Sequence, residues 1–229
     1  MDILDLIMKI DYSPIIISLK TGVVATVMAF FTGTLLAWRV GEMKGKIKKI
    51  IDCIFTLPLV LPPTVAGFFL LLLFSTRRPF GGFLYNSFHI KVIQTYIGCV
   101  VAAFVISFPL MYRNARAAFD LVDKDMIYAA RTLGMPEFTI FRKVIMPAAK
   151  PGILTGSVLT FTRSIGEYGA TSMLAGNIPG RTSTISQKIA MVLMDNDYVT
   201  AGFYVAVIVI ISFFAIYIIS SMEGKFGRY

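Results

Sequence analysis

Apolar residues gather in five long stretches along the 229-residue chain, and the segments between them carry most of the charge. A helix needs about 20 mostly apolar residues to cross the hydrocarbon layer of a membrane. The pattern therefore predicts an all-α membrane protein with about five spanning helices in a single domain over residues 1–229. The predicted spans cover about residues 14–38, 51–74, 93–111, 151–174 and 200–222.

The second stretch differs from the others because Pro58, Pro62 and Pro63 interrupt it. Proline removes a backbone donor, and irregular backbone is tolerated in a membrane only where protein or a water-filled cavity covers it. A kink that lines a pore and a kink that packs against another helix both fit this pattern.

Shorter patterns predict further elements between and within the stretches. Pro and Gly residues predict an irregular loop over 75–92. Residues 184–194 place apolar side chains on one helical face, which predicts a short helix at the membrane surface. Gly152 and Gly156 form a G-x-x-x-G pair that lets two membrane helices approach closely.

The basic residues predict the orientation of the chain. The net charge is +9, and the 22 Lys and Arg residues lie mainly in short loops between apolar stretches. This is the positive-inside pattern of membrane proteins and is not typical of a nucleic-acid surface. Fourteen of them fall in the loop 39–50, the segment 112–150 and the C-terminal tail, against six in the other loops. We expect these regions in the cytoplasm and the N-terminus outside, although Arg77 and Arg78 oppose the trend.

Residues that bind metals or perform catalysis are scarce. Cys53, Cys99 and His89 match no metal spacing and no disulfide framework, and they supply no catalytic constellation. A P-loop requires G-x-x-x-x-G-K-[ST], and the run that begins at Gly41 has the wrong spacing. We therefore expect a non-enzymatic chain that binds no metal or cofactor, with any ATP and Mg bound by a separate subunit.

The polar segment 112–150 is too long to be a plain connector. Its middle is helix-forming sequence that ends at Gly134, a residue suited to the position after a helix C-terminus. Pro136 opens a second short helix, which is expected to close at 144–147. Two short helices joined at Gly134 form a compact projection that fits a cleft on a soluble partner, and a solvated surface loop also fits the sequence.

This segment resembles the loop of ABC-importer permeases, whose pattern is Glu-Ala-Ala, three residues, Gly, nine residues and Ile-x-Leu-Pro. Both spacings match without gaps. In the family the loop docks into a groove of the ATPase subunit and transmits its movement, and the resemblance implies that role here. Tyr128 replaces the family's acid, and Asp125, one turn earlier, is a candidate substitute. The implied coupling residues are Asp125, Tyr128, Ala129, Ala130, Arg131, Gly134, Pro136, Val144, Met146 and Pro147.

The fourth stretch is unusually polar for a membrane helix. Its polar residues recur at helical spacing, so we expect them to share a face. They are Thr160, Ser164, Glu167, Tyr168 and Thr171. Arg163 and Glu167 lie four residues apart and can pair. Charged residues within a membrane usually face a bundle interior or water, which predicts a translocation pathway here, with a structural ion pair as the other interpretation. Hydroxyls and Arg163 could donate to a tetrahedral dianion, whereas Glu167 would gate or orient Arg163.

The runs 163–171, 175–182 and 57–65 are similar to those of molybdate permeases. Sulfate permeases share the Gly-Glu-aromatic-Gly core of the first run. The resemblance implies the fold of a type I ABC-importer permease in the cytoplasmic (inner) membrane, which moves molybdate or tungstate by alternating access. Sulfate or thiosulfate is the alternative substrate. The implied partners are a second permease copy, a dimer of ATPase subunits and an extracytoplasmic binding protein, which docks on external loops that include 181–194.

Other classes of membrane protein fit the sequence less well. An ion-coupled secondary transporter would use intramembrane ionisable residues as a relay, but only Arg163 and Glu167 are available and no second half repeats the first. A structural membrane scaffold would leave the polar residues of the fourth stretch unexplained.

Overall fold

A computed structural model describes residues 10–226, and the predictions for residues 1–9 and 227–229 lie outside this range. The regular elements of the described chain are helices, which confirms the predicted all-α class. In chain order they are α2 Ser13–Glu42, α3 Gly45–Val60, α4 Pro63–Phe74, α5 Pro79–Phe88, α6 Tyr96–Asp120, α7 Lys124–Thr132, α8 Glu137–Ile140, the π-helix η1 Phe141–Ile145, α9 Met146–Ile165, α10 Gly169–Ala175, α11 Ile185–Met194 and α12 Tyr198–Phe226.

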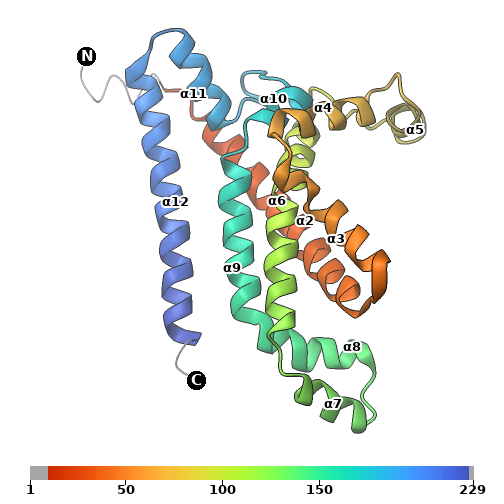
Figure 1. The fold of residues 1–229 in the computed structure, drawn as a ribbon. Coiled ribbons are helices and arrows are strands. Elements are labelled where there is room, and N and C mark those ends of the chain that lie inside the picture. Colours follow the sequence, from red (N-terminus) through yellow and green to blue (C-terminus); the bar gives the residue numbers. More distant parts are fainter. Residues whose placement is uncertain (1–9, 227–229) are drawn as a thin grey trace.

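The centre of the molecule is a bundle of α2, α6 and α9, with α12 alongside α9 (Figure 1). Small residues make this packing close. Ala25, Ala29, Gly33 and Ala37 recur every four residues along α2 and are buried. A Cβ atom at Gly33 would lie 3.0 Å from Cγ of Met111 in α6. In a membrane, helices associate through close packing of this kind, because lipid provides no hydrophobic driving force.

The G-x-x-x-G pair of α9 packs against α6, as predicted. A Cβ atom at Gly152 would lie 2.7 Å from Cβ of Ala118, and one at Gly156 would lie 2.7 Å from Cβ of Asn114. Glycine is therefore required at both positions for the two helices to approach this closely. By contrast, a Cβ atom at Gly202 in α12 would have no neighbour within 4 Å among the described residues, so this glycine faces open space.

The second apolar stretch forms two helices instead of one straight helix. α3 and α4 meet at an angle of 114° around Leu61 and Pro62. Pro63 takes the first position of α4, where its missing N–H costs no hydrogen bond. The prolines thus predict the interruption correctly, but only the structure shows how large the bend is.

Three other boundaries differ from the predictions. The predicted loop 75–92 contains the helix α5, because Pro79 starts a helix as well as a turn. The third stretch continues to Asp120, because small residues such as Ala115 and Ala118 keep one face of α6 buried among its polar residues. The fourth stretch breaks after Ile165, where α9 ends and three residues lead into α10.

By length and composition, four helical runs of the described chain can cross a membrane: α2, α6, Glu137–Ile165 and α12. The bent pair α3–α4 would make a fifth. The predicted cytoplasmic segments 39–50 and 112–150 lie toward one end of the bundle, with α7 and α8 at its tip, and α5, α10 and α11 lie at the other (Figure 1). This separation of the loops matches the one that the basic residues predict.

Candidate functional site

The break between α9 and α10 is organised by the carboxylate of Glu167. One of its oxygens accepts a hydrogen bond from the backbone N–H of Ala170 at 2.9 Å, near the start of α10. The other accepts one from Nη1 of Arg163 at 2.8 Å, in the last turn of α9. Glu167 is only 2% exposed. A buried carboxylate needs such partners, and here they tie the end of one helix to the start of the next.

Arg163 is the exposed member of this ion pair. Its side chain retains 34% of its accessible surface, against 1% for Glu167. Among the described residues its guanidinium makes a single hydrogen bond, the one to Glu167. An arginine carries several further N–H donors, which can bind an anion while Glu167 holds the side chain in place. The predicted pairing of these residues is confirmed.

The hydroxyl groups near the break lie inside the protein. Thr160 donates to the carbonyl of Gly156 at 2.7 Å, and Ser164 donates to the carbonyl of Thr160 at 2.7 Å. Both residues and Thr171 are buried, whereas Tyr168 is 43% exposed. The prediction that all the polar residues share one helical face is wrong, because the helix ends at Ile165. Arg163 and Tyr168 are the ones that reach the surface.

The α9–α10 break meets the bend between α3 and α4. A Cβ atom at Gly67 in α4 would lie 2.7 Å from Cα of Ala170, so the two backbones are in direct contact. A Cβ atom at Gly169 would lie 3.0 Å from Cβ of Pro63. Sequence reasoning missed this contact, although a glycine among the large side chains of α4 was a signal for it. Broken helices that meet within a membrane protein commonly form its transport site.

The segment after α10 is held by buried polar contacts. The side-chain amide of Gln187 donates to the carbonyl of Gly176 at 2.9 Å and accepts from the N–H of Thr184 at 2.9 Å. The N–H of Ile185 donates to the hydroxyl of Ser18 in α2 at 2.8 Å. These contacts therefore fix the C-terminal end of α10 and the start of α11 to the central bundle.

The predicted helix over 184–194 is present as α11, but its apolar face is not directed at a membrane surface. Ile185 is fully buried and packs with Tyr204 of α12, and Ile189 packs against the same cluster. The period of the apolar residues predicts the helix correctly, but it cannot distinguish a lipid surface from a neighbouring helix.

The predicted hairpin of two helices around Gly134 is present at the opposite end of the bundle. Asp123 caps the start of α7 by accepting the N–H of Asp125 at 2.9 Å. Gly134 has φ of +74°, and the N–H of Met135 donates to the carbonyl of Ala130. This is the Schellman arrangement that ends a helix at a glycine. Asp125 is exposed in the first turn of α7.

The second helix of the hairpin does not close at 144–147, in contrast to the prediction. The π-helix η1 connects α8 directly to α9, and the N–H of Met146 donates to the carbonyl of Phe141. Pro147 has no N–H, and a wider turn before it accommodates this loss without a break. The hairpin and α9 therefore form one continuous helical path from Glu137 to Ile165.

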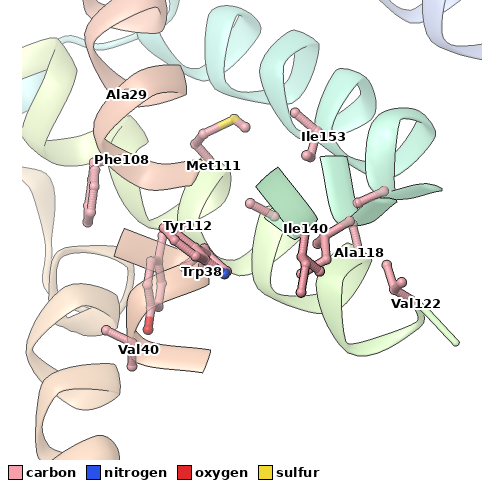
Figure 2. Close-up of a cluster of buried hydrophobic side chains, with 14 of the residues drawn as sticks. Ala29, Trp38, Val40, Phe108, Met111, Tyr112, Ala118, Val122, Ile140 and Ile153 are labelled. Carbon is pink, nitrogen blue, oxygen red and sulfur yellow. The ribbon is translucent and has the colours of Figure 1, made fainter. Parts of the chain in front are cut away.

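The base of the hairpin is packed into the hydrophobic core. The ring of Phe141 stacks on Trp38 of α2 at a centroid distance of 4.3 Å. Ala130 of α7 and Ile140 of α8 are buried in the same cluster. Figure 2 shows Ile140 among side chains from α2 and α6. These contacts join the base of the hairpin to α2 and α6 by close packing, and close-packed interiors transmit strain.

The outer face of the hairpin is apolar and exposed. Leu133 is 76% exposed, Phe138 is 65% exposed and Tyr128 is 55% exposed. Next to them Arg131 makes two hydrogen bonds to Glu137, at 2.8 and 3.1 Å, and this ion pair lowers the pKa of the Glu137 carboxyl. Exposed large apolar side chains on a structured projection indicate a surface that a partner covers.

Comparisons with known proteins agree with this architecture. Residues 21–222 match the family described as binding-protein-dependent transport system inner membrane component. The chain belongs to this family. It is thus an inner membrane component with several spanning helices, and its relatives are permease subunits of transport systems.

Relatives with named substrates fall in two groups. The molybdenum transport system permease protein ModB of Escherichia coli (strain K12) is 40% identical over 175 residues, which are 76% of each chain. ModB of Azotobacter vinelandii is 32% identical over 220 residues, 95% of this chain and 96% of that protein. The sulfate transport system permease protein CysT of Salmonella typhimurium (strain LT2) is 34% identical over 212 residues, 93% of this chain and 76% of that protein.

Solved structures confirm the fold. A chain of a bacterial alginate ABC transporter, in complex with its alginate-bound periplasmic protein, superposes with a TM-score of 0.75 at 15% identity. The match covers 99% of this permease-family chain and 83% of that one. The MetNI methionine ABC transporter matches with a TM-score of 0.62 at 16% identity, over 90% and 94% of the two chains. The chain therefore has the fold of a type I ABC-importer permease.

Proposed function

We propose that this chain is the permease subunit of an ABC importer for molybdate, and for tungstate, which has nearly the same shape and charge. The observation that carries the proposal is the position of the Arg163 guanidinium at the break between α9 and α10, where the buried Glu167 holds it. Its remaining N–H donors bond to none of the described residues. A tetrahedral oxyanion matches such donors. The names of the relatives support molybdenum as the element transported by their systems.

In this proposal the α7–α8 hairpin docks on a separate ATPase subunit, which binds ATP and Mg. The exposed Leu133 and Phe138 provide the apolar contact, and Tyr128 adds to it where the family has an acid. Because the hairpin continues into α9, movement at Gly134 reaches Arg163 and the break along one helical path. Alternating access then opens the broken helices to one side of the membrane at a time.

The complete importer would contain a second copy of this chain, a dimer of the ATPase subunit and an extracytoplasmic binding protein. The family description itself names dependence on a binding protein. The turn around Gly180 and the helix α11 lie at the end opposite the hairpin, which makes 181–194 the candidate docking region (Figure 1). We assign this end to the outside and the hairpin to the cytoplasm.

Sulfate is a second candidate substrate because sulfate permeases are also among the relatives. The decisive experiment reconstitutes the complex in proteoliposomes and measures ATP hydrolysis with the binding protein and each oxyanion in turn. We expect stimulation by molybdate and tungstate, and little by sulfate or thiosulfate. Stimulation by sulfate alone would reassign the substrate, and stimulation by no oxyanion would overturn the proposal.

The role of Arg163 can be tested in the same vesicles. We expect Arg163→Gln to abolish oxyanion uptake, because the substituted amide has no charge for the anion. The matched control is Lys46→Gln, which removes an exposed cation in the first turn of α3, a residue given no part in substrate binding or docking. Equal uptake by both variants would show that Arg163 does not bind the substrate.

The orientation has a separate test in cells. In a Cys53→Ala background, where the remaining Cys99 is buried, a membrane-impermeant thiol reagent should label Gly180→Cys from outside. It should label Gly134→Cys only after the membrane is opened. The reverse pattern would place the hairpin outside and exclude its coupling to an ATPase in the cytoplasm.

A further inference from the structure

The helix α5 stands away from the rest of the molecule (Figure 1). Among the described helices, α4 is the one that makes an extended contact with it. The rings of Phe74 and Phe80 lie 5.6 Å apart, and this contact joins α5 to the end of α4. Apart from the side at Gly81 and Gly82, which packs against residues 74–76, α5 therefore faces an environment that the described chain does not supply.

One face of α5 carries large apolar side chains. Phe80, Phe83, Leu84 and Phe88 recur at the spacing of an amphipathic helix. Phe80 is 47% exposed, Phe83 is 59% exposed and Phe88 is 61% exposed. Asn86 lies on the other side of the helix by the same periodicity. A soluble surface rarely displays such an aromatic stripe without a partner.

Cations without partners flank this stripe. Arg77 and Arg78 precede the helix and Lys91 follows it, and none of their charged groups makes an ion pair or hydrogen bond among the described residues. The sequence contains no acid between Asp52 and Asp120 that could balance them. Two arginines at a helix N-terminus also oppose the helix dipole, so they do not serve the stability of α5. They attract an anion instead.

An anionic phospholipid surface provides a partner for the aromatic stripe and for the flanking cations at the same time. Its acyl region accepts aromatic side chains, and its phosphates lie in the adjacent layer, where Arg and Lys bind them. A second copy of the chain would bring the same cations to the contact. At this end of the molecule, Asp11 and Asp197 already accept hydrogen bonds from Ser13 and Thr200. Among the described acids at this end, Glu167 is buried and paired with Arg163, so the three exposed carboxylates of Asp11, Asp195 and Asp197 would face three such cations from each copy.

We propose that α5 lies in the plane of the membrane, at the outer surface of the inner membrane. There it anchors the chain to anionic phospholipids through Arg77, Arg78 and Lys91. The choice of the outer leaflet rests on the orientation given under the proposed function. The anchor also accounts for the arginine pair that opposes the positive-inside trend: these cations bind lipid headgroups and do not set the orientation.

Spin labels test the placement of the helix. The full-length chain, in the assembly in which it purifies, is placed in nanodiscs with phosphatidylglycerol and labelled at single cysteines in the Cys53→Ala background. Labels at Phe83→Cys and Phe88→Cys should collide with oxygen, whereas a label at the control position Asn86→Cys should collide with a water-soluble nickel complex. Exposure of all three to nickel would overturn the proposal. So would labels at 83 and 88 that neither reagent reaches, because a protein partner would then cover the stripe.

A lipid measurement tests the cations. We expect the variant Arg77→Gln/Arg78→Gln/Lys91→Gln to retain about fivefold less phosphatidylglycerol, relative to phosphatidylcholine, after purification from mixed vesicles. The control Arg181→Gln/Lys188→Gln removes charge from the same end and should retain the native ratio. Equal ratios in the two variants would overturn the proposal. Neither measurement requires transport or ATP, so both test the lipid anchor even if the importer carries another substrate. If the triple variant does not assemble, the spin labels alone test the proposal.

Discussion

The helix break at Glu167 and the α7–α8 hairpin place polar and apolar groups in opposite ways. At the break the charged carboxylate is buried and fully partnered, and the hydroxyls of Thr160 and Ser164 bond to their own helix. On the hairpin the ion pair is exposed, and large apolar side chains such as Leu133 lie on the surface.

This difference indicates how each region acts. Polar groups buried in a membrane protein are costly unless partnered, so the break is set by internal contacts that any movement must rearrange. Apolar groups exposed on a structured hairpin gain stability only when a partner covers them. The break is therefore sensitive to changes within the chain, whereas the outer face of the hairpin is sensitive to changes in what binds it.

The largest effect should come from the ion pair at the break. Arg163→Ala leaves the buried Glu167 with one partner and should lower the free energy of unfolding by about 3 kcal/mol. The double variant Arg163→Ala/Glu167→Gln should recover much of this loss, because it removes the unpaired charge. Thermal unfolding of the purified chain measures both. If the loss of stability in the double variant equalled the sum of the losses in Arg163→Ala and Glu167→Gln, the ion pair would not stabilise the break.

The contact between α4 and α10 should rank next. Gly67→Ala places a methyl group 2.7 Å from Cα of Ala170, and such overpacking should cost about 2 kcal/mol. The matched control is Gly202→Ala, where nothing lies within 4 Å and stability should change by less than about 0.5 kcal/mol. Unfolding midpoints of the two variants give the comparison. Loss of stability or assembly in the control would show instead that α12 meets another chain at Gly202.

The hairpin should respond in binding and not in folding. Leu133 is 76% exposed, so Leu133→Ser should leave the unfolding midpoint unchanged while it raises Kd for the ATPase subunit about tenfold. Met194, which is 80% exposed at the opposite end, provides the control Met194→Ser with unchanged Kd. Titration of the ATPase subunit onto the immobilised permease measures both values. A normal Kd for Leu133→Ser would exclude this face from the docking surface.

The smallest effect should come from the exposed ion pair of the hairpin. Arg131→Gln should destabilise α8 by less than about 1 kcal/mol at neutral pH, since solvent screens the pair. The pKa of Glu137 is lowered by Arg131, so the contribution is present at neutral pH and is lost as the pH falls below the carboxyl's ordinary value of 4.5. Amide hydrogen exchange in α8 at both pH values measures it. A difference between the variant and the native chain that persisted in acid would have another cause.

The sequence predicts the local features of both regions well. The spacing of Arg163 and Glu167 predicts their pairing, and Gly134 predicts where α7 ends, because both depend on residues within one turn of each other. The helix path through Pro147 was not predicted. Its π-turn begins at Phe141, whose ring stacks on Trp38, a residue more than a hundred positions away in the sequence.

The sequence by itself determined that this chain is a helical membrane protein, how many apolar stretches it has and where a two-helix hairpin projects. Apolar length, charge and glycine positions decide these features locally. Only the tertiary structure decided which polar side chains of the fourth stretch are buried. It also decided that α3 and α4 meet at 114° and that this bend contacts the helix break at Glu167. Such contacts depend on backbone approach between distant segments, and a residue pattern along one helix does not specify which neighbour will lie against it.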